Sequence, residues 1–258
     1  MNAVSPRLVE QLMPEWSAFE DVMTSRRPDH GTACEAWTVR DIAAHQAGNA
    51  EELARVLRAH LSDDIVPPTR SFEQREPVYR SMNDVELHRA LVDRMHELAQ
   101  VGDEAVASDG AAFVPWTGRR MRVRWFLEHM REELVIHRWD IAGDDDLSTA
   151  FLSAPWFTEH SVLAVGQPLL MRGYERWSGE RVFSARLRSE TRDDVVVSIA
   201  PDGPNIKLAP PAGDAVLETD PAARALLIWG RRPADCTRIR SDAGFATLGA
   251  TRRLLSGY

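Results

Sequence analysis

The chain has 258 residues, which is enough for one large domain or two domains of ordinary size. Apolar residues make up 44% of it and charged residues 27%, the balance of a soluble protein with a sizeable core. The net charge of −8 and the lack of any run of four basic residues argue against a nucleic-acid-binding protein. The first residues do not resemble a signal peptide and no apolar run could span a bilayer, so we expect a cytoplasmic protein.

Four stretches in the first half of the chain carry apolar residues at intervals of three and four, the period of an amphipathic helix. The helices are expected at about residues 6–23, 38–60, 83–98 and 121–141, with Ser5 capping the first and a glycine-rich loop at 102–118. Pro14 is expected to bend the first helix. Helices with such stripes and connections pack as a four-helix bundle, which we place at residues 1–145.

After residue 180 the hydrophobic period changes from that of a helix to two, which is typical of strands. We expect strands at 181–188, 194–199 and 215–219, a turn at 202–204, and a helix from Pro221 to Gly230 before a short strand and a final helix. Residues 146–180 are expected to form a linking helix and residues 181–258 a small α+β domain. The predicted fold class is therefore α+β, with the bundle first.

Polar side chains on two of the predicted helices suggest a metal site. Glu133 and His137 are four residues apart, which puts both side chains on one helix face, close enough to bind one ion. His45 shares a helix face with Ile42 and Leu53 and so points into the bundle. Two histidines and one carboxylate on facing helices are a common way for bundles to bind a metal. Three protein ligands leave a position open, as in catalytic zinc sites, although ferrous iron accepts the same set.

The spacing alone leaves other interpretations open. A glutamate four residues before a histidine is common by chance and is often a surface pair. The same helix carries Glu128, His129 and Glu132, and the pattern does not choose among these ligands. Asn49 lies one turn after His45. Its side chain would either hydrogen-bond a ligand of the site or lie in the core with its hydrogen bonds made to the protein. A nearby Asp140 would orient a ligating histidine or serve as a cap or ion-pair partner.

Two motifs resemble those of the mycothiol-dependent maleylpyruvate isomerase family. Residues 37–45 read W-T-V-R-D-I-A-A-H, which is similar to the family's first motif, and residues 133–140 match its second, E-x-x-x-H-x-x-D. The resemblance implies a DinB-like bundle in which the histidine of the first motif and the glutamate and histidine of the second bind a metal. These positions are His45, Glu133 and His137 here.

The second half also resembles this family, whose second domain is sterol-carrier-like. Residues 226–231, L-L-I-W-G-R, are similar to a helix end that carries a catalytic arginine in the family, and the matching position is Arg231. Arg232, next to it, leaves the register open. We expect Arg231 to clamp a carboxylate from one wall of a cleft between the domains, with the metal on the other wall. The alternative is that Arg231 caps its own helix.

The resemblance also implies a thiol cosubstrate, mycothiol, which actinobacteria make. An arginine-rich, lysine-poor composition fits a GC-rich genome, since only Lys207 of the 31 basic residues is lysine. A divalent ion, expected to be Zn²⁺, deprotonates a thiol bound to it, and the thiolate is the nucleophile. We expect thiol transfer to, or thiol exchange on, a small electrophile by a monomer or homodimer without nucleic-acid or membrane partners. The alternatives are a cis–trans isomerase of the maleylpyruvate type and a non-catalytic small-ligand-binding protein with a structural metal.

Overall fold

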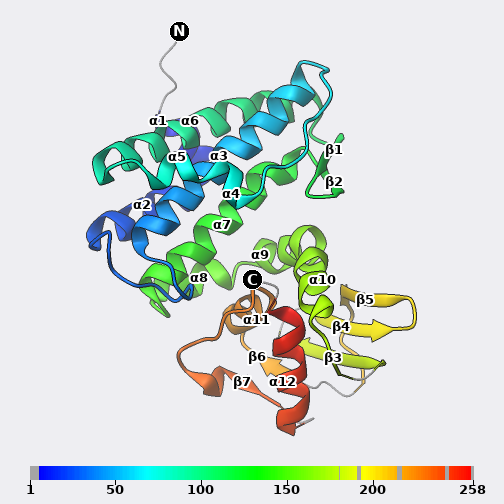
Figure 1. Cartoon of the computed structure of the whole chain (residues 1–258). Helices are drawn as coiled ribbons and strands as arrows, with labels where there is room; N and C mark the ends of the chain where they lie inside the picture. Colours follow the sequence, from blue (N-terminus) through cyan, green and yellow to red (C-terminus); the bar gives the residue numbers. More distant parts are fainter. Residues whose placement is uncertain (1–5, 180, 191–192, 214–216, 242–243, 257–258) are drawn as a thin grey trace. The chain divides into compact units, whose positions relative to one another are not determined.

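The computed structural model of the chain forms two compact units, Met1–Ala142 and Gly143–Tyr258 (Figure 1). It describes residues 6–179, 181–190, 193–213, 217–241 and 244–256. The first unit is helical and the second combines helices with a sheet, so the predicted α+β class is confirmed. Among the described residues, no helix combines the length and the apolar content that a membrane span requires.

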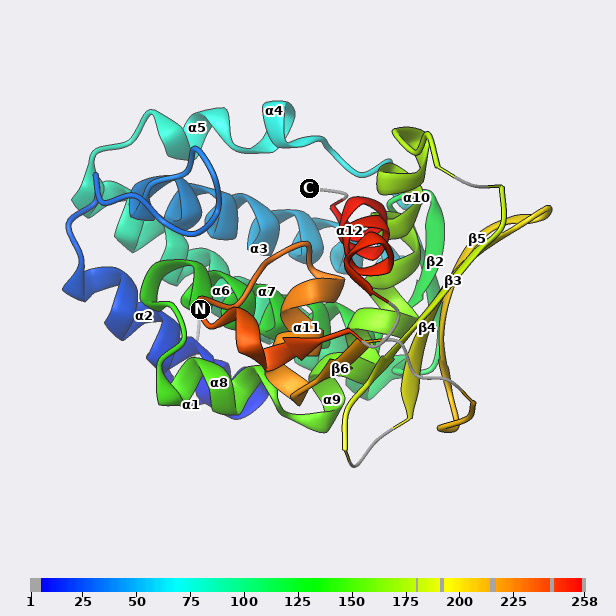
Figure 2. The same cartoon turned by 90° about the horizontal axis from the view of Figure 1, so that it is seen from below.

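The first unit is a bundle built around two long helices, α3 and α6, which pack along each other, and α7, which packs on both (Figures 1 and 2). A short α1 contacts α6, and α2 contacts α7. The elements of this unit are α1 (Pro6–Leu12), α2 (Trp16–Ser25), α3 (Val39–Leu61), α4 (Phe72–Arg75), α5 (Pro77–Arg80), α6 (Asp84–Asp109), β1 (Phe113–Trp116), β2 (Arg119–Arg122) and α7 (Arg124–Ala142).

The two predicted capping signatures start the two long helices. Thr38 and Asp41 form a reciprocal capping box at α3, and Asn83 and Glu86 form another at α6. Pro14 lies between α1 and α2, so the stretch expected as one bent helix is two helices. The expected cap Ser5 lies outside the described residues.

The stretch expected as a glycine-rich loop differs in the structure. Helix α6 continues through Gly102 to Asp109, and the residues after it form a hairpin of β1 and β2. The absent side chain of Gly102 makes room for α7, because a Cβ there would lie 2.6 Å from Leu127 Cδ2. Thr117 and Gly118 join the strands with φ of 49° and 74°, the two positive values of a type I′ turn.

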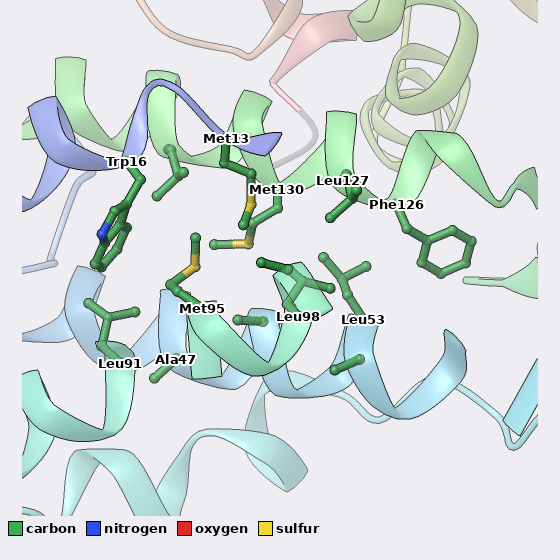
Figure 3. Packing of buried hydrophobic residues seen from close by; sticks show 14 of the residues in the cluster. Met13, Trp16, Ala47, Leu53, Leu91, Met95, Leu98, Phe126, Leu127 and Met130 are labelled. Carbon is green, nitrogen blue, oxygen red and sulfur yellow. The ribbon is translucent and has the colours of Figure 1, made fainter. Parts of the chain in front are cut away.

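The apolar stripes of these helices meet in one core. Met13 directly follows α1, Met95 belongs to α6 and Met130 to α7, and their thioether side chains lie together at its centre (Figure 3). Leu53 of α3 and Leu98 of α6 extend the core along the bundle. Burying a side chain of this size contributes about 1.5–3 kcal/mol, so packing, not helix propensity, holds α3 and α7 in place.

The second unit contains a five-stranded sheet in the order β5-β4-β3-β6-β7, in which the β3–β6 pair is parallel and the other pairs are antiparallel. Helix α11 contacts β6, and α10 contacts β5 and α12. Its elements are α8 (Asp146–Leu152), α9 (Pro155–His160), a π-helical segment (Ser161–Gly166), α10 (Gln167–Glu175), β3 (Phe183–Arg188), β4 (Asp194–Ala200), β5 (Gly203–Ala209), β6 (Leu217–Thr219), α11 (Pro221–Ile228), a 3₁₀ turn (Cys236–Arg238), β7 (Ile239–Arg240) and α12 (Gly244–Leu255).

Two features of the second unit differ from the expectation. The segment expected as a linking helix is part of the unit and is broken after α8, where Pro155 starts α9 as its first helical residue. The turn lies at residues 201–202, and a strand that was not expected, β5, begins at Gly203, within the range predicted for the turn. The predicted strand 215–219 is described only from Leu217 onwards.

Candidate metal centre

The three predicted ligands come together inside the bundle. His45 lies on the second turn of α3, and Glu133 and His137 lie one turn apart on α7. The Nε2 atoms of His45 and His137 each lie 3.4 Å from the same oxygen, Glu133 Oε2. The three ligand atoms lie within 4.8 Å of one another, which is the spacing of atoms around one ion. All three side chains are buried.

The other nitrogen of each histidine faces a second carboxylate. His45 Nδ1 lies 2.7 Å from Glu76 Oε1, and His137 Nδ1 lies 2.9 Å from Asp140 Oδ2. A carboxylate accepts hydrogen bonds, so the bond with Glu76 assigns the proton of a neutral His45 ring to Nδ1. The His137–Asp140 contact has the distance of an ion pair but not the geometry of a hydrogen bond, so it does not assign the tautomer of His137. The Nε2 lone pair of His45 then faces Glu133, and Nε2 of His137 faces the same oxygen.

This arrangement needs a positive charge at its centre. Two imidazole nitrogens and a carboxylate oxygen converge in a buried space, and their mutual repulsion is relieved either by a cation or by an added proton on a histidine. Burial lowers the pKa of His137, but the contacts with Asp140 and Glu133 outweigh burial and raise it above its usual value. Burial raises the pKa of Glu133, but His137 and His45 outweigh this and hold that pKa well below its usual range. The site therefore favours an ionised glutamate and suits a divalent ion.

The order of residues in the motif 37–45 has a physical basis in this geometry. Trp37 stacks on His137 with ring centroids 5.9 Å apart and lies 5.0 Å from the His45 ring. Thr38 caps α3 through Asp41, and Asp41 also binds Arg80. The segment thus starts the helix that carries His45 and places an aromatic wall beside both histidines.

The rival residues on α7 take different places. His129 Nε2 lies 3.6 Å from Glu133 Oε1, the other oxygen of that carboxylate, and its ring lies against Trp116. It is not a member of the group of three, and neither Glu128 nor Glu132 belongs to that group. Asn49 is buried, and its Nδ2 has no hydrogen-bond partner among the described residues, so the interpretation as a satisfied core amide does not hold for that atom.

Sequence reasoning missed Glu76. This residue lies between the short helices α4 and α5, in a segment without helical or strand periodicity, and its partner His45 is 31 residues away. Burial raises the pKa of Glu76, but the hydrogen bond with His45 and the nearby Arg80 outweigh it and lower the pKa below its usual range. No local signal marked this carboxylate, because the contact depends on how the segment folds back onto α3.

In the second unit, Arg231 follows a helix end of the Schellman type. Gly230 has a φ of 70°, and the Arg231 N–H donates to the Leu226 carbonyl oxygen at 2.8 Å. The Arg231 guanidinium is buried and donates from Nη1 to the Trp229 carbonyl oxygen at 2.9 Å. This contact is the one expected of a side chain that caps its own helix. The proposed clamp on a substrate stays a prediction.

The fold and the site define a helical-bundle protein with a buried His–Glu–His centre, followed by an α+β unit. Residues 9–142 match the family model described as the mycothiol maleylpyruvate isomerase N-terminal domain. The chain belongs to this family, as its motifs indicated, and is therefore a member of an enzyme family.

Two solved structures share the fold over most of the chain. They are crystal structures of the mycothiol-dependent maleylpyruvate isomerase and of a histidine-to-alanine mutant of it. They are 18% and 17% identical to this chain, each with a TM-score of 0.66 and with 92% of both chains covered. A search of curated proteins found no match.

Proposed function

We propose that this chain is a metal-dependent enzyme that activates mycothiol for transfer to, or exchange on, a small electrophilic substrate. The observation that carries the proposal is the convergence of His45, Glu133 and His137 on one point of a buried site. Membership of a family named for a mycothiol-dependent enzyme supports the choice of thiol. Zn²⁺ is the proposed ion, since two imidazoles and one carboxylate are a ligand set of catalytic zinc.

The residues of the chain prepare the site for this chemistry. A divalent ion held by these three ligands would lower the pKa of a thiol that enters its open position. The ligand set carries a single negative charge, on Glu133, so an ion of charge +2 keeps a net positive charge that attracts a thiolate. Glu76 is proposed to hold the His45 imidazole through a hydrogen bond to Nδ1, and Asp140, whose Oδ2 lies 2.9 Å from His137 Nδ1, is proposed to orient the second imidazole. Arg231 is proposed to orient a carboxylate of the substrate or a polar group of the thiol.

Cis–trans isomerisation of a maleylpyruvate-type substrate is the second candidate. It is favoured by the two structural neighbours, which are maleylpyruvate isomerases. In isomerisation the thiolate adds to the activated double bond, rotation follows and the thiolate is eliminated, whereas in transfer the thiolate displaces a leaving group from the electrophile. The two reactions differ in the product, which contains the thiol after transfer and does not contain it after isomerisation.

The first test is the metal content of the purified protein, which we expect to be about one divalent ion per chain. Substitution His137→Ala removes a ligand and should abolish tight metal binding while the bundle stays folded, because packing holds its core. His129→Ala is the matched control on the same helix and should keep the metal. Full occupancy of the His137→Ala variant, or loss of metal from His129→Ala, would contradict the assignment.

The second test separates the two reactions. The metal-loaded protein is incubated with mycothiol and a set of small electrophiles that includes maleylpyruvate, and the products are identified by mass spectrometry. An adduct of mycothiol supports transfer, and a trans isomer with mycothiol unchanged supports isomerisation. Conversion of the electrophiles at the same rate without mycothiol would contradict the thiol-dependent mechanism.

A further inference from the structure

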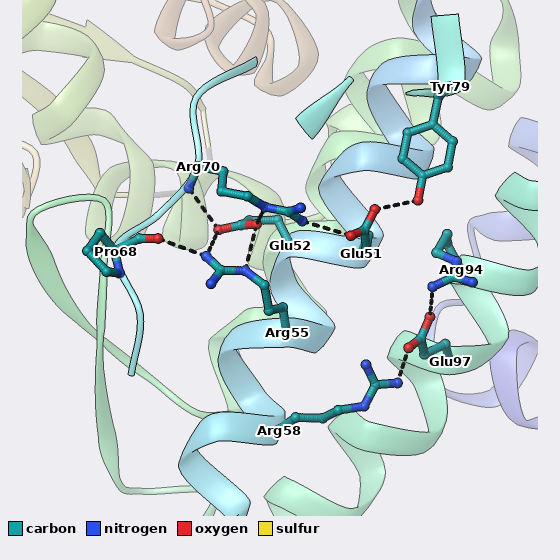
Figure 4. Close-up of polar contacts among 9 residues, drawn as sticks. All are labelled: Glu51, Glu52, Arg55, Arg58, Pro68, Arg70, Tyr79, Arg94 and Glu97. Carbon is teal, nitrogen blue, oxygen red and sulfur yellow. Dashed lines mark hydrogen bonds and ion pairs between the residues drawn. The ribbon is translucent and has the colours of Figure 1, made fainter. Parts of the chain in front are cut away.

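The segment from Arg70 to Arg80, which we call the strap, lies across α3 and is fastened at its first end by a charged network (Figure 4). The Arg70 guanidinium binds Glu52 Oε2 at 2.6 Å and Glu51 Oε1 at 2.9 Å, and the Arg70 N–H donates to Glu52 Oε1 at 2.9 Å. Glu52 is fully buried. Arginine bound by two neighbouring carboxylates is a rigid attachment, because its planar donors fix direction as well as distance.

The other end of the strap is fastened to the same helix. The Tyr79 hydroxyl donates to Glu51 Oε2 at 2.5 Å, so Glu51 holds both ends of the strap (Figure 4). Arg80 binds Asp41 near the start of α3 and also binds Glu76 Oε2, with Nη2 at 2.8 Å. Glu76 thus lies between two anchored points.

Gly48 provides the space into which Glu76 fits. A Cβ at Gly48 would lie 3.3 Å from Glu76 Cγ, which is closer than nearly all real contacts of this kind. Gly48 is three residues after His45 on α3, so the same helix face offers the histidine and the gap beside it. One oxygen of Glu76 is occupied by Arg80, and the other, Oε1, meets His45 Nδ1 at 2.7 Å.

We propose that Glu76 is a positioning residue that holds His45 in the tautomer protonated on Nδ1, with the Nε2 lone pair aimed at the ion. This inference rests on the proposed function, since it concerns the affinity of that metal site. A carboxylate that accepts the proton of a ligating histidine fixes the ring and raises its basicity, and loss of such a partner costs about 10–100-fold in metal affinity.

The diagnostic variant is Glu76→Gln, which keeps the size and shape of the side chain. Its amide oxygen is drawn to the Arg80 guanidinium, and its NH₂ group is then turned towards His45. An NH₂ group donates, so His45 Nδ1 must accept, and the ring proton moves to Nε2, where it blocks the ion. We expect the Kd for Zn²⁺ to rise by about 10–100-fold, measured by competition with a chromophoric chelator on the full chain.

The matched control is Glu73→Gln, an exposed glutamate on the same strap, which should leave the Kd within about twofold of wild type. The second readout is the absorption spectrum of the Co²⁺-loaded protein, which reports the ligand field and should change for Glu76→Gln alone. An unchanged Kd and Co²⁺ spectrum in Glu76→Gln would overturn the inference, as would an equal loss of affinity in Glu73→Gln.

Two further variants keep the test decisive. If Glu76→Gln does not fold, Gly48→Ala is used, because its methyl group would crowd Glu76 Cγ at 3.3 Å and Arg75 Cγ at 3.4 Å without removing the carboxylate, and we expect it to raise the Kd for Zn²⁺. An unchanged Kd in Gly48→Ala would then count against the inference. His45→Ala tests the proposed function separately. If it loses the metal while Glu76→Gln keeps it, only the role of Glu76 is wrong; if it keeps the metal, the ligand assignment itself fails.

Discussion

Asp41 acts in both the folding of α3 and the arrangement of the metal site. Its carboxylate accepts from the Thr38 backbone N–H at 2.9 Å in the capping box, and it also binds Arg80, which holds Glu76. Burial raises the pKa of Asp41, but Thr38 and Arg80 outweigh burial and hold that pKa below its usual range. Asp41 therefore caps α3 and also connects the start of this helix to His45 through Arg80 and Glu76.

The sequence was sufficient to bring together the candidate ligands, which lie on regular helices, and insufficient to find the carboxylate that contacts one of them. His45, Glu133 and His137 could be placed from helical spacing and the family motifs, because a helix fixes which side chains share a face. Glu76 could not be placed, because its approach to His45 depends on the anchoring of Arg70 and Tyr79 on Glu51. The sequence around Glu76 shows neither helical nor strand periodicity, so no pattern indicates its contact with His45.

The buried carboxylate of Glu52 should make stability depend on pH. Burial raises its pKa, but hydrogen bonds from Arg55 and Arg70 outweigh burial and lower the pKa below its usual range. A lowered folded pKa means that the ionised group stabilises the protein above the unfolded pKa of about 4.3 and loses this contribution as pH falls through the folded pKa.

We therefore expect Glu52→Gln to lower the free energy of unfolding by about 1–3 kcal/mol at pH 7 and by less near pH 3. Urea unfolding of the full chain at both pH values measures the difference. Glu104→Gln, at an exposed position of α6, is the control and should have little effect at either pH. A difference between Glu52→Gln and wild type that is the same at pH 3 and pH 7 would contradict this account.

At the element scale, strongly periodic helices were predicted and weakly patterned strands were not. Strand β5 lies at the end of the sheet order, and of its seven residues only Ile206 is buried, so the alternation that marks a strand is faint. The β1–β2 hairpin was hidden for another reason. Glycines at 102, 110 and 118 suggested a loop, whereas Gly102 lies inside α6 at the close approach of Leu127.

Two helices of the second unit, α10 and α12, also approach each other closely at a glycine. Gly173 of α10 faces the backbone of α12, and a Cβ at that position would lie 1.9 Å from the Leu254 carbonyl oxygen. Backbone atoms cannot move aside as a flexible side chain can, so α10 and α12 would have to separate. We expect Gly173→Ala to destabilise the second unit by about 3 kcal/mol or more, measured by thermal unfolding of the full chain.

Gly249→Ala on α12 is the matched control. The nearest atom to a Cβ at Gly249 is Arg253 Nη1 at 3.5 Å, an ordinary contact. Alanine has the higher helix propensity, so this variant should be neutral or more stable by about 0.5–1 kcal/mol. Equal stability of the Gly173→Ala and Gly249→Ala variants would show that the helices tolerate the added methyl group.

At the scale of the whole molecule, the candidate metal ligands and the candidate clamp lie in different units. His45, Glu133 and His137 belong to the first unit, together with the neighbouring carboxylates of Glu76 and Asp140. Arg231 belongs to the second. A substitution at Arg231 is therefore expected to change turnover without changing metal binding.

Arg231→Lys tests this separation. Lysine keeps the charge but lacks the planar pair of donors that a carboxylate accepts in a bidentate contact. If Arg231 clamps the substrate or the thiol, turnover should fall by about tenfold or more, whereas metal content and melting temperature stay near those of wild type. Turnover is measured with mycothiol and the electrophile identified in the product screen.

Arg232→Lys is the control for the register of this motif, since Arg232 is exposed beside the buried Arg231. It should retain activity. If the Arg231→Lys variant is as active as the wild-type protein, the clamp interpretation is wrong, and helix capping remains as the role of Arg231. Loss of activity in Arg232→Lys alone would instead transfer the clamp to that residue.

His45 and Glu133 are 88 residues apart in the chain, so an ion shared by them closes a long loop of the polypeptide. Such an ion acts as a reversible cross-link, because it binds the native arrangement and not the unfolded chain. At a free-ion concentration 1,000 times the Kd it would add about 4 kcal/mol to the free energy of unfolding. The rate at which proteases degrade the protein would then depend on the metal supply of the cell. A chelator would speed up degradation by lowering the free energy of unfolding.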